Sequence, residues 1–223
     1  MTAQKKQSGV KNDAAKKQAV IDAALPHIAF DGFTDKLMDR AAKAAGASKD
    51  DMLRLFPNGA LSLLAAASES VDAEMEKRLA KLKLAAMPMR KRIATAVKTR
   101  LAILKPHKEA ARRAVAHLTL PPNVALGAKL VYRTVDAMWR AAGDVSTDFN
   151  FYTKRAILTG VYSATLMRWF TDDSADESAT DAFLAARIEN VMQFEKLKAR
   201  VKEQAERLPS FSEVLSGLTA RKS

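Results

Sequence analysis

The 223-residue sequence contains no cysteine and only three histidines. The absence of cysteine excludes a disulfide scaffold, a thiolate metal site and a cysteine nucleophile. No two histidines lie four residues apart and no Glu-x-x-His pair occurs, so the spacing that a zinc or di-iron site on helices requires is missing. A Gly-x-Gly-x-x-Gly run, a P-loop and a Gly-x-Ser-x-Gly motif are missing too. We therefore predict a protein that is not an enzyme and binds no cofactor or metal.

Long hydrophobic runs and an excess of negative charge are also lacking. No uninterrupted apolar run approaches the ~18 residues that cross a bilayer, so we expect a soluble or peripheral protein. The net charge is +12 and the pI is near 9.9, which attracts nucleic acid, anionic lipid or an acidic partner. Part of this charge lies in the lysine-rich start, and we predict that residues 1–11 form a flexible basic tail.

Apolar residues recur at three- and four-residue spacing along most of the chain, which predicts an all-α fold of about nine to ten helices. Pro88, Pro106 and Pro121 suit first helical turns, where a missing N–H costs nothing. Pro26 lies inside the first helix and predicts a kink or an early end. The expected ranges are about 12–30, 34–45, 48–56, 61–84, 88–104, 106–118, 121–143, 147–170 and 176–208, followed by a short helix within 209–223.

Residues 12–58 read as helix, turn and helix, and GFTDKLMDRAAKAAGASKDDMLRLFPNG resembles the helix-turn-helix of TetR-type regulators. This unit is a three-helix portion, and its third helix, expected over 48–56, carries Asp50 and Asp51 in its first turn, where a DNA-reading helix approaches phosphates. Two carboxylates at this position would repel the phosphates of DNA and so disfavour DNA binding. We therefore predict a vestigial helix-turn-helix that does not bind specific DNA, with a TetR-type regulator controlled by a lipid effector as the alternative.

The last residues, 209–223, form one apolar stripe. The stripe has helical spacing i, i+3, i+4 and i+7, and two cations follow it. Such a helix docks on its own domain, on a partner or on a bilayer, where four apolar side chains and nearby cations support reversible attachment. The stripe consists of Phe211, Val214, Leu215 and Leu218.

The stretch AGDVSTDFNFYTKR, residues 142–155, is unusually rich in aromatic rings for a polar turn. Its Ser, Thr and Asp residues suit a helix start, and the rings are Phe149, Phe151 and Tyr152. Adjacent helical residues point about 100° apart, so we expect at least one ring to be exposed as an anchor. Further along, Ala156, Gly160 and Ala164 form a row of small residues that indicates either core packing or a dimer seam.

The same stretch carries the most specific resemblance. VDAMWRAAGDVSTDFNFYTKRAILTGVYSATLMRWFTDDSADESATDAFLAARIENV, residues 135–191, resembles the C-terminal core of the COQ-nine family of ubiquinone-biosynthesis accessory proteins. The N-terminal helix-turn-helix is similar to that family's vestigial TetR-like portion, so the resemblance covers about residues 20–208. The family's Trp in Asn-Trp-Tyr is Phe151 here, which keeps a ring but removes the indole N–H donor.

The resemblance implies a TetR-like homodimer whose lipid-binding and dimerisation domain spans residues 59–208. An internal apolar pocket would bind lipid, including isoprenoid quinone intermediates. A surface patch of Met138, Asp148, Phe151 and Tyr152 would dock the di-iron hydroxylase that oxidises demethoxyubiquinone.

The resemblance also implies a place in the cell. Phe211, Val214, Leu215 and Leu218 would hold the protein on the membrane. The location would be the inner face of the cytoplasmic membrane, or the matrix side of the inner membrane in mitochondria. A scaffold that binds the hydroxylase without lipid is a further alternative.

Overall fold

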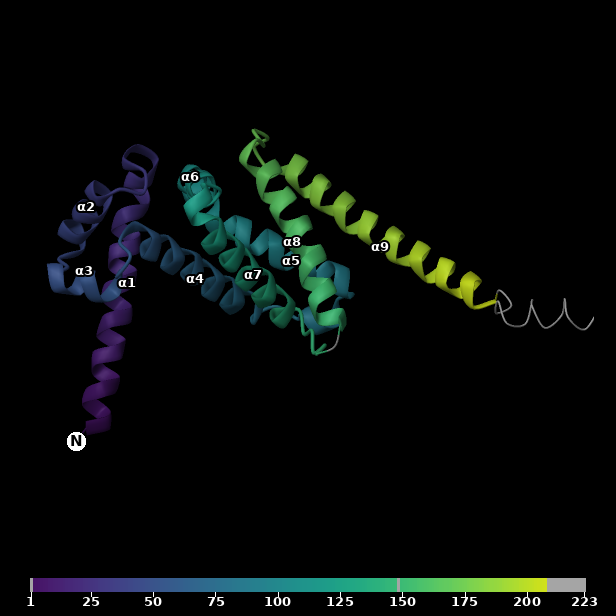
Figure 1. Ribbon diagram of the computed structural model, residues 1–223, viewed down its shortest axis with the longest axis horizontal. Coiled ribbons are helices and arrows are strands. Elements are labelled where there is room, and N and C mark those ends of the chain that lie inside the picture. Colours follow the sequence, from purple (N-terminus) through teal and green to yellow (C-terminus); the bar gives the residue numbers. More distant parts are fainter. Residues whose placement is uncertain (1, 148, 208–223) are drawn as a thin grey trace, which may run out of the picture.

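The computed structural model describes residues 2–147 and 149–207, with side chains described for residues 12–147 and 150–193. This described part is helical and contains no strand, so the predicted all-α class is confirmed (Figure 1). Its α-helices are α1 (Thr2–Asp31), α2 (Asp35–Ala45), α3 (Lys49–Leu55), α4 (Ala60–Leu79), α5 (Met89–Leu104), α6 (Lys108–Leu118), α7 (Val124–Ala141), α8 (Phe149–Phe170) and α9 (Ser178–Arg207). Short 3-10 helices, η1 (Leu84–Ala86), η2 (Lys105–His107) and η3 (Pro121–Asn123), precede α5, α6 and α7.

The N-terminal helices α2 and α3 are capped by residues next to them in the sequence. The Thr34 side chain accepts a hydrogen bond from the Leu37 N–H at the start of α2. Gly46 ends α2 with a φ of 63°, a left-handed conformation that glycine adopts without a Cβ clash. Ser48 and Asp51 form a reciprocal capping box at the start of α3. Local side-chain chemistry therefore sets the bounds of α2 and α3.

Two predicted helix bounds were wrong. The first helix begins at Thr2 instead of about residue 12, so the predicted flexible tail is helical from Thr2 on. Lysine, glutamine and alanine are good helix formers, and they let α1 extend toward the N-terminus. The helix also continues through Pro26 without ending early. The helix expected over 61–84 ends at Leu79, and η1 follows. The helix predicted within 209–223 lies outside the described residues.

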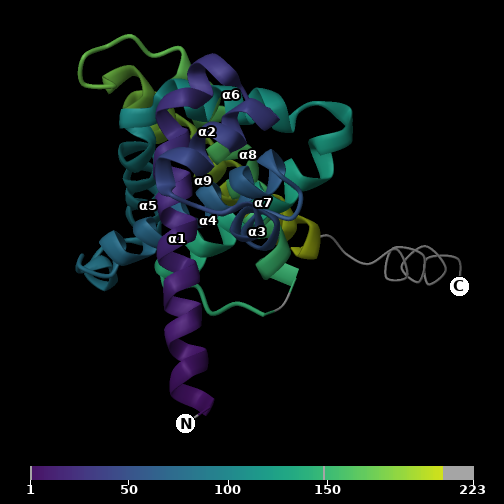
Figure 2. The same ribbon diagram turned by 90° about the vertical axis from the view of Figure 1, so that its left-hand side faces the viewer.

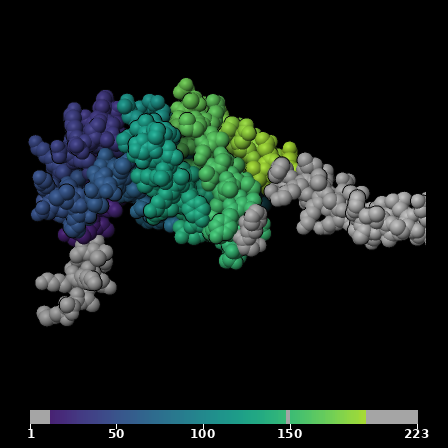
Figure 3. Space-filling view, viewed as in Figure 1, coloured from purple at the N-terminus to yellow at the C-terminus, as the bar shows by residue number. Residues whose placement is uncertain are grey.

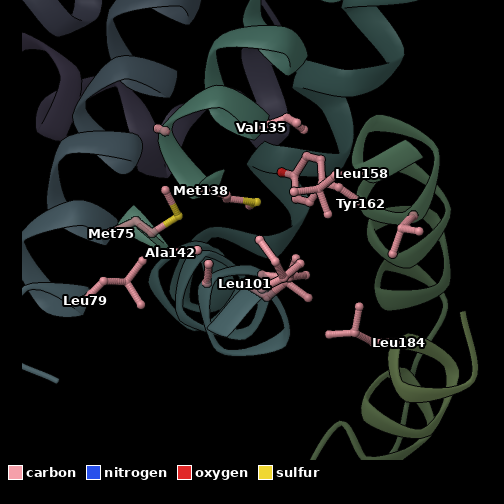
Figure 4. Packing of buried hydrophobic residues seen from close by; sticks show 14 of the residues in the cluster. Met75, Leu79, Leu101, Val135, Met138, Ala142, Leu158, Tyr162 and Leu184 are labelled. Atoms are coloured by element: carbon pink, nitrogen blue, oxygen red, sulfur yellow. The ribbon is translucent and has the colours of Figure 1, made fainter. Parts of the chain in front are cut away.

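The apolar side chains form two separate cores. One core joins α1, α2 and the first turns of α4, and contains Val20, Leu37 and Leu63 among its buried residues. The other joins the last turns of α4 to α5, α7, α8 and the start of α9; Figure 4 shows part of its packing. Because α4 contributes to both cores, it links the N-terminal helices to the rest of the protein.

The molecule is elongated, with the three N-terminal helices at one end (Figures 1 and 3). Helices α4 to α8 pack in the middle, and α9 runs along α8 before extending beyond the bundle. The first turns of α1 also extend away from the bundle in both ribbon views (Figure 2). This arrangement brings α1 and α6 together although they are far apart in sequence.

Candidate functional site: an apolar cavity and an aromatic corner

A cavity of about 140 Å³ lies where the two cores meet. Side chains from α1, α4, α5, α6, α7 and α8 line it, so every long helix of the central bundle contributes. Most of the lining is apolar, and the α1 contribution comes from Ile21, Ala24, Leu25 and Ile28 at helical spacing. An engineered cavity of about 150 Å³ lined by Leu, Ile and Phe binds benzene. The cavity therefore has room for one ring or one isoprene unit as it stands.

Polar side chains lie on one wall of this cavity. Arg100 of α5 is only 6 % exposed and is ion-paired with Asp72 of α4 at 2.8 Å. Its guanidinium also donates to the hydroxyl oxygen of Tyr162 at 2.7 Å. His107 lines the cavity as well, and His27, His107 and His117 are all partly buried. A small number of polar side chains therefore line a cavity that is otherwise apolar.

The second feature is the turn between α7 and α8, residues 142–152, which we call the aromatic corner. Asp144 lies at its centre, and its side chain is 3 % exposed. It accepts hydrogen bonds from the Ser146 hydroxyl at 2.7 Å, the Lys154 ammonium at 2.8 Å and Arg155 Nη1 at 3.3 Å. Burial by itself raises the pKa of Asp144, but the hydrogen bonds and charges of Lys154, Ser146 and Arg155 outweigh it and hold the pKa at about 2.

Arg155 ties the aromatic corner to α7 and orients the first turn of α8. It is 2 % exposed, and its guanidinium contacts Asp136 at 2.7 Å as well as Asp144. The same guanidinium lies 3.4 Å from the centre of the Phe151 ring and donates to the Phe151 carbonyl oxygen at 3.2 Å. On the other side, the Trp139 indole donates to the Lys154 carbonyl oxygen at 3.2 Å. The corner is therefore held by charge pairs between two helices rather than by an apolar core.

The predicted partner-binding residues have different environments. Tyr152 is 66 % exposed, and its ring meets the partly buried Phe151 ring edge-on at 5.1 Å. The expectation of at least one exposed ring is therefore met by Tyr152, with Phe151 beneath it. Val145, which the sequence reasoning did not single out, is 90 % exposed at the same corner.

Met138 does not lie on the surface. It is 0 % exposed in the core of the bundle, so its inclusion in the surface patch was wrong (Figure 4). Its helical position points it toward α4 and α8 instead of outward, because α7 packs against both helices. Asp148 and the Phe149 side chain lie outside the described residues. Asp144 and Arg155, which hold the corner, were missed, although the Ala-Gly-Asp stop and the Lys-Arg pair are visible in the sequence.

The small-residue row of α8 is not part of this chain's core. Ala156 and Gly160 are exposed and Ala164 is partly buried. Gly160, Val161 and Ala164 line a groove with Arg187 and Val191 of α9, and a Cβ built on Gly160 meets nothing within 4 Å. Ala156 and Gly160 are therefore not packed in the core of this chain, whereas Ala164 is partly buried where α8 meets α9.

The helix that would read DNA, α3, has only seven residues. Asp51 contacts Lys16 at 2.7 Å and Arg54 at 3.0 Å, and Arg54 also bonds Asp13. The hydrogen bonds from Lys16 and Ser48 hold the pKa of Asp51 well below its usual range. Asp51 is thus ion-paired with two of the cations beside α3, Lys16 and Arg54.

None of the helices in residues 2–147 and 149–207 combines the length and the apolar character that a membrane span needs. In the same part of the chain, no three His, Asp or Glu side chains are grouped so that they could hold a metal ion.

Comparison with known proteins connects this architecture to one family. The COQ9 family model matches residues 124–195, which include α7, the aromatic corner, α8 and the first half of α9. The mitochondrial ubiquinone biosynthesis protein COQ9 of Rattus norvegicus is 32% identical over 195 residues, covering 85% of this chain and 62% of that protein. The Homo sapiens protein of the same name is 31% identical over 195 residues, covering 85% of this chain and 61% of its own length. The chain thus spans about three fifths of these relatives.

A solved structure shares the fold. It is the TetR transcriptional regulator from Nitrosomonas europaea ATCC 19718, with a TM-score of 0.62 over 78% of this chain and 95% of that one. The two sequences are 20% identical, so the likeness concerns the fold alone. The TetR-like architecture expected from the helix-turn-helix pattern is therefore confirmed, and so is the family resemblance expected from residues 135–191.

Proposed function

We propose that this chain, which matches the COQ9 family model over residues 124–195, acts in ubiquinone biosynthesis as a non-catalytic, lipid-binding accessory protein. It binds an isoprenoid quinone intermediate and presents it to the demethoxyubiquinone hydroxylase at a membrane surface. The relatives' names place them in mitochondria, which supports the matrix side of the inner membrane; in a bacterium the equivalent place is the inner face of the cytoplasmic membrane.

The observation that carries the lipid-binding proposal is the apolar cavity between the two cores. A well-packed interior leaves few voids larger than a water molecule, and an apolar void of this size favours an apolar occupant. The cavity volume of about 140 Å³ is below the ~300 Å³ at which drug-sized ligand sites begin. A long isoprenoid chain therefore requires the lining helices to move apart.

Native mass spectrometry after mild purification tests lipid binding directly. We expect a co-purified isoprenoid or phospholipid at one molecule per chain. Protein that carries no lipid, and that takes up none from isoprenoid-containing vesicles, would contradict the proposal and leave the scaffold alternative.

The exposed ring of Tyr152 supports a docking role for the aromatic corner. Exposed aromatic side chains above a rigid base are typical anchors at protein interfaces. Here the ion pairs of Arg155 with Asp136 and Asp144 hold the first turn of α8 in place. The Tyr152 ring is exposed on that turn, where the chain reverses direction between α7 and α8.

Tyr152→Ala is expected to weaken binding of the hydroxylase at least about tenfold, because a central aromatic anchor is lost. The free energy of unfolding should change by less than about 1 kcal/mol, since the ring is mostly exposed. A pull-down titration together with thermal denaturation measures both. Tyr132→Ala, at a half-exposed tyrosine in the middle of α7, is the matched control and should leave the pull-down unchanged. A large stability loss for Tyr152→Ala without a binding loss would refute the anchor role.

A basic turn between α4 and α5 supports contact with an anionic membrane. It exposes four cations together with Leu82 and Met89, which are 45% and 38% exposed. Arg92 joins this turn to the aromatic corner, because it donates to the carbonyl oxygens of Met87 and Ala142 at 2.8 Å and 2.9 Å. The four cations are Lys81, Lys83, Arg90 and Lys91.

Reversing two of these charges, Lys81→Glu with Lys83→Glu, is expected to weaken binding to phosphatidylserine-containing vesicles by at least about tenfold. Each cation near such a surface contributes roughly 1 kcal/mol, and the effect should shrink as salt rises. Vesicle co-sedimentation measures it. Lys43→Glu with Lys49→Glu makes the same change in net charge on exposed residues of the N-terminal helices. Equal losses for both pairs would mean that net charge alone governs binding.

We also propose that the chain forms a homodimer through the groove between α8 and α9. Small side chains at Gly160 and Ala164 permit close approach of a second helix.

The TetR-like fold also leaves open a DNA-binding regulator with a lipid effector. A gel-shift titration at physiological salt decides that alternative, since tight and sequence-selective binding would favour it, whereas weak, salt-sensitive binding follows from the charge of +12 alone.

A further inference from the structure

The polar wall of the cavity is assembled from four different helices. Ser68 and Asp72 come from α4, Arg100 from α5, Thr134 from α7 and Tyr162 from α8. Arg100, Thr134 and Tyr162 are 6%, 2% and 2% exposed. All of these residues except Asp72 line the cavity. A cluster that depends on four helices is a property of the folded bundle rather than of any one segment.

The hydrogen bonds within this cluster do not use all of its donor hydrogens. Arg100 donates through Nε to Asp72 at 2.8 Å, through Nη1 to the Tyr162 oxygen at 2.7 Å and through Nη2 to Ser68 at 3.2 Å. Thr134 donates its hydroxyl to the Asp72 carboxylate at 2.9 Å. The carboxylate of Asp72 balances the charge of Arg100, so the pair is neutral overall.

Tyr162 has a hydroxyl proton to give. Its oxygen already accepts from Arg100, and burial raises the pKa of Tyr162, so the phenol keeps its proton. Among the described residues, no acceptor is found for this O–H. Each guanidinium Nη of Arg100 carries two hydrogens, and only one of each pair is used in the contacts above. Buried donors without acceptors are costly, so this wall favours an occupant that offers an oxygen.

We infer that Arg100 and Tyr162 form the head-group site of the cavity, binding an uncharged carbonyl or phenolic oxygen on the ring of an isoprenoid ligand. This inference rests on the proposed lipid-binding function. The volume of about 140 Å³ accommodates one ring beside the two donors. With the ring at the two donors, the isoprenoid tail follows the apolar lining from α1 and α6 once the lining helices have moved apart to admit it. Because Asp72 already neutralises Arg100, the site favours a neutral oxygen over the carboxylate of a fatty acid.

The inference is tested by isothermal titration of the full chain with three probes. The probes are a ubiquinone with two isoprene units, geranylbenzene, which has a ring and the same tail without oxygen, and dodecanoate. Tyr162→Phe removes only the hydroxyl, and we expect it to weaken quinone binding by about 3- to 10-fold while geranylbenzene binding stays within about twofold. Tyr132→Phe removes a half-exposed hydroxyl outside the cavity and should change neither.

The possible outcomes separate the inference from the function on which it rests. If the unaltered protein binds none of the probes, both the proposed function and the inference fail. If quinone and geranylbenzene bind and Tyr162→Phe affects both equally or neither, only the inference fails. Tighter binding of dodecanoate than of the quinone would overturn the preference for a neutral oxygen.

A second measurement needs no variant and therefore does not depend on how Tyr162→Phe folds. Infrared difference spectroscopy of the bound quinone should show its carbonyl stretch at lower frequency than in hexane, because a hydrogen bond weakens the C=O bond. A carbonyl stretch that does not move from its position in hexane would overturn the inference.

Discussion

Arg155→Ala is expected to lower the free energy of unfolding by about 3 kcal/mol, because breaking a buried ion pair from one side leaves uncompensated charge behind. Arg155 is 2% exposed, and its loss would leave Asp144, whose side chain is 3% exposed, without one of its two cations. For a chain of this length the melting temperature should fall by roughly 10 °C. Chemical and thermal denaturation measure the two quantities.

The matched control is Arg140→Ala. Arg140 lies near the end of α7 and contacts the same Asp136 at 3.4 Å, but its side chain is 61% exposed. Exposed ion pairs contribute little, so this variant should lose less than about 1 kcal/mol. If Arg155→Ala were no more destabilising than Arg140→Ala, the aromatic corner would not depend on its charge pairs.

Arg155→Ala should also weaken hydroxylase binding, since Phe151 loses the guanidinium that lies over its ring.

Ala67→Phe is expected to abolish lipid binding by filling the cavity. Ala67 lies on α4 and lines the cavity, as do three alanines of α6. A phenyl ring placed there takes the volume that the ligand would use, so the lipid that co-purifies with the unaltered protein should be absent from native mass spectra. Overpacking a well-filled core usually costs about 1–3 kcal/mol. Here the cost should be smaller, because the ring enters space that no side chain occupies.

Ala73→Phe provides the comparison on the same helix. Ala73 is exposed and lies outside the cavity lining, so this variant adds the same ring without filling the chamber. It should retain lipid. A result in which Ala67→Phe folds normally and still carries lipid would place the ligand somewhere else, and a loss of lipid in both variants would point to a general effect of the added ring.

The boundaries of the short helices were predictable because their signals are local. Thr34, Gly46 and Ser48 each act on backbone groups within four residues, so their role is visible in the sequence. The start of α1 was not predictable in the same way, because lysine-rich segments resemble both solvated tails and exposed helices. The sequence predicted a helix over about 121–143 but did not show that Met138 would lie on its buried side.

The functional residues likewise include some that the sequence predicted and some that only the structure showed. The family resemblance drew attention to Phe151 and Tyr152, and helical geometry predicted that one ring would be exposed, without saying which. The structure assigns exposure to Tyr152 because Arg155, four residues from Phe151, covers the Phe151 ring. No spacing in the sequence predicted the contacts of Arg100, because its partners are 28 to 62 positions away.

The sequence alone determined the helical class, the caps of α2 and α3, the TetR-like order of the N-terminal helices and the relationship of residues 135–191 to one family. These properties depend on side chains within a few turns of one another, or on a run of residues read directly. Only the tertiary structure decided three features. These are the position of the cavity between the two cores, the exposure of the Tyr152 ring, and the place of the Arg100 and Tyr162 donors on the wall of that apolar cavity. Each of these depends on distances between helices far apart in the chain, and those distances exist only after the bundle has packed.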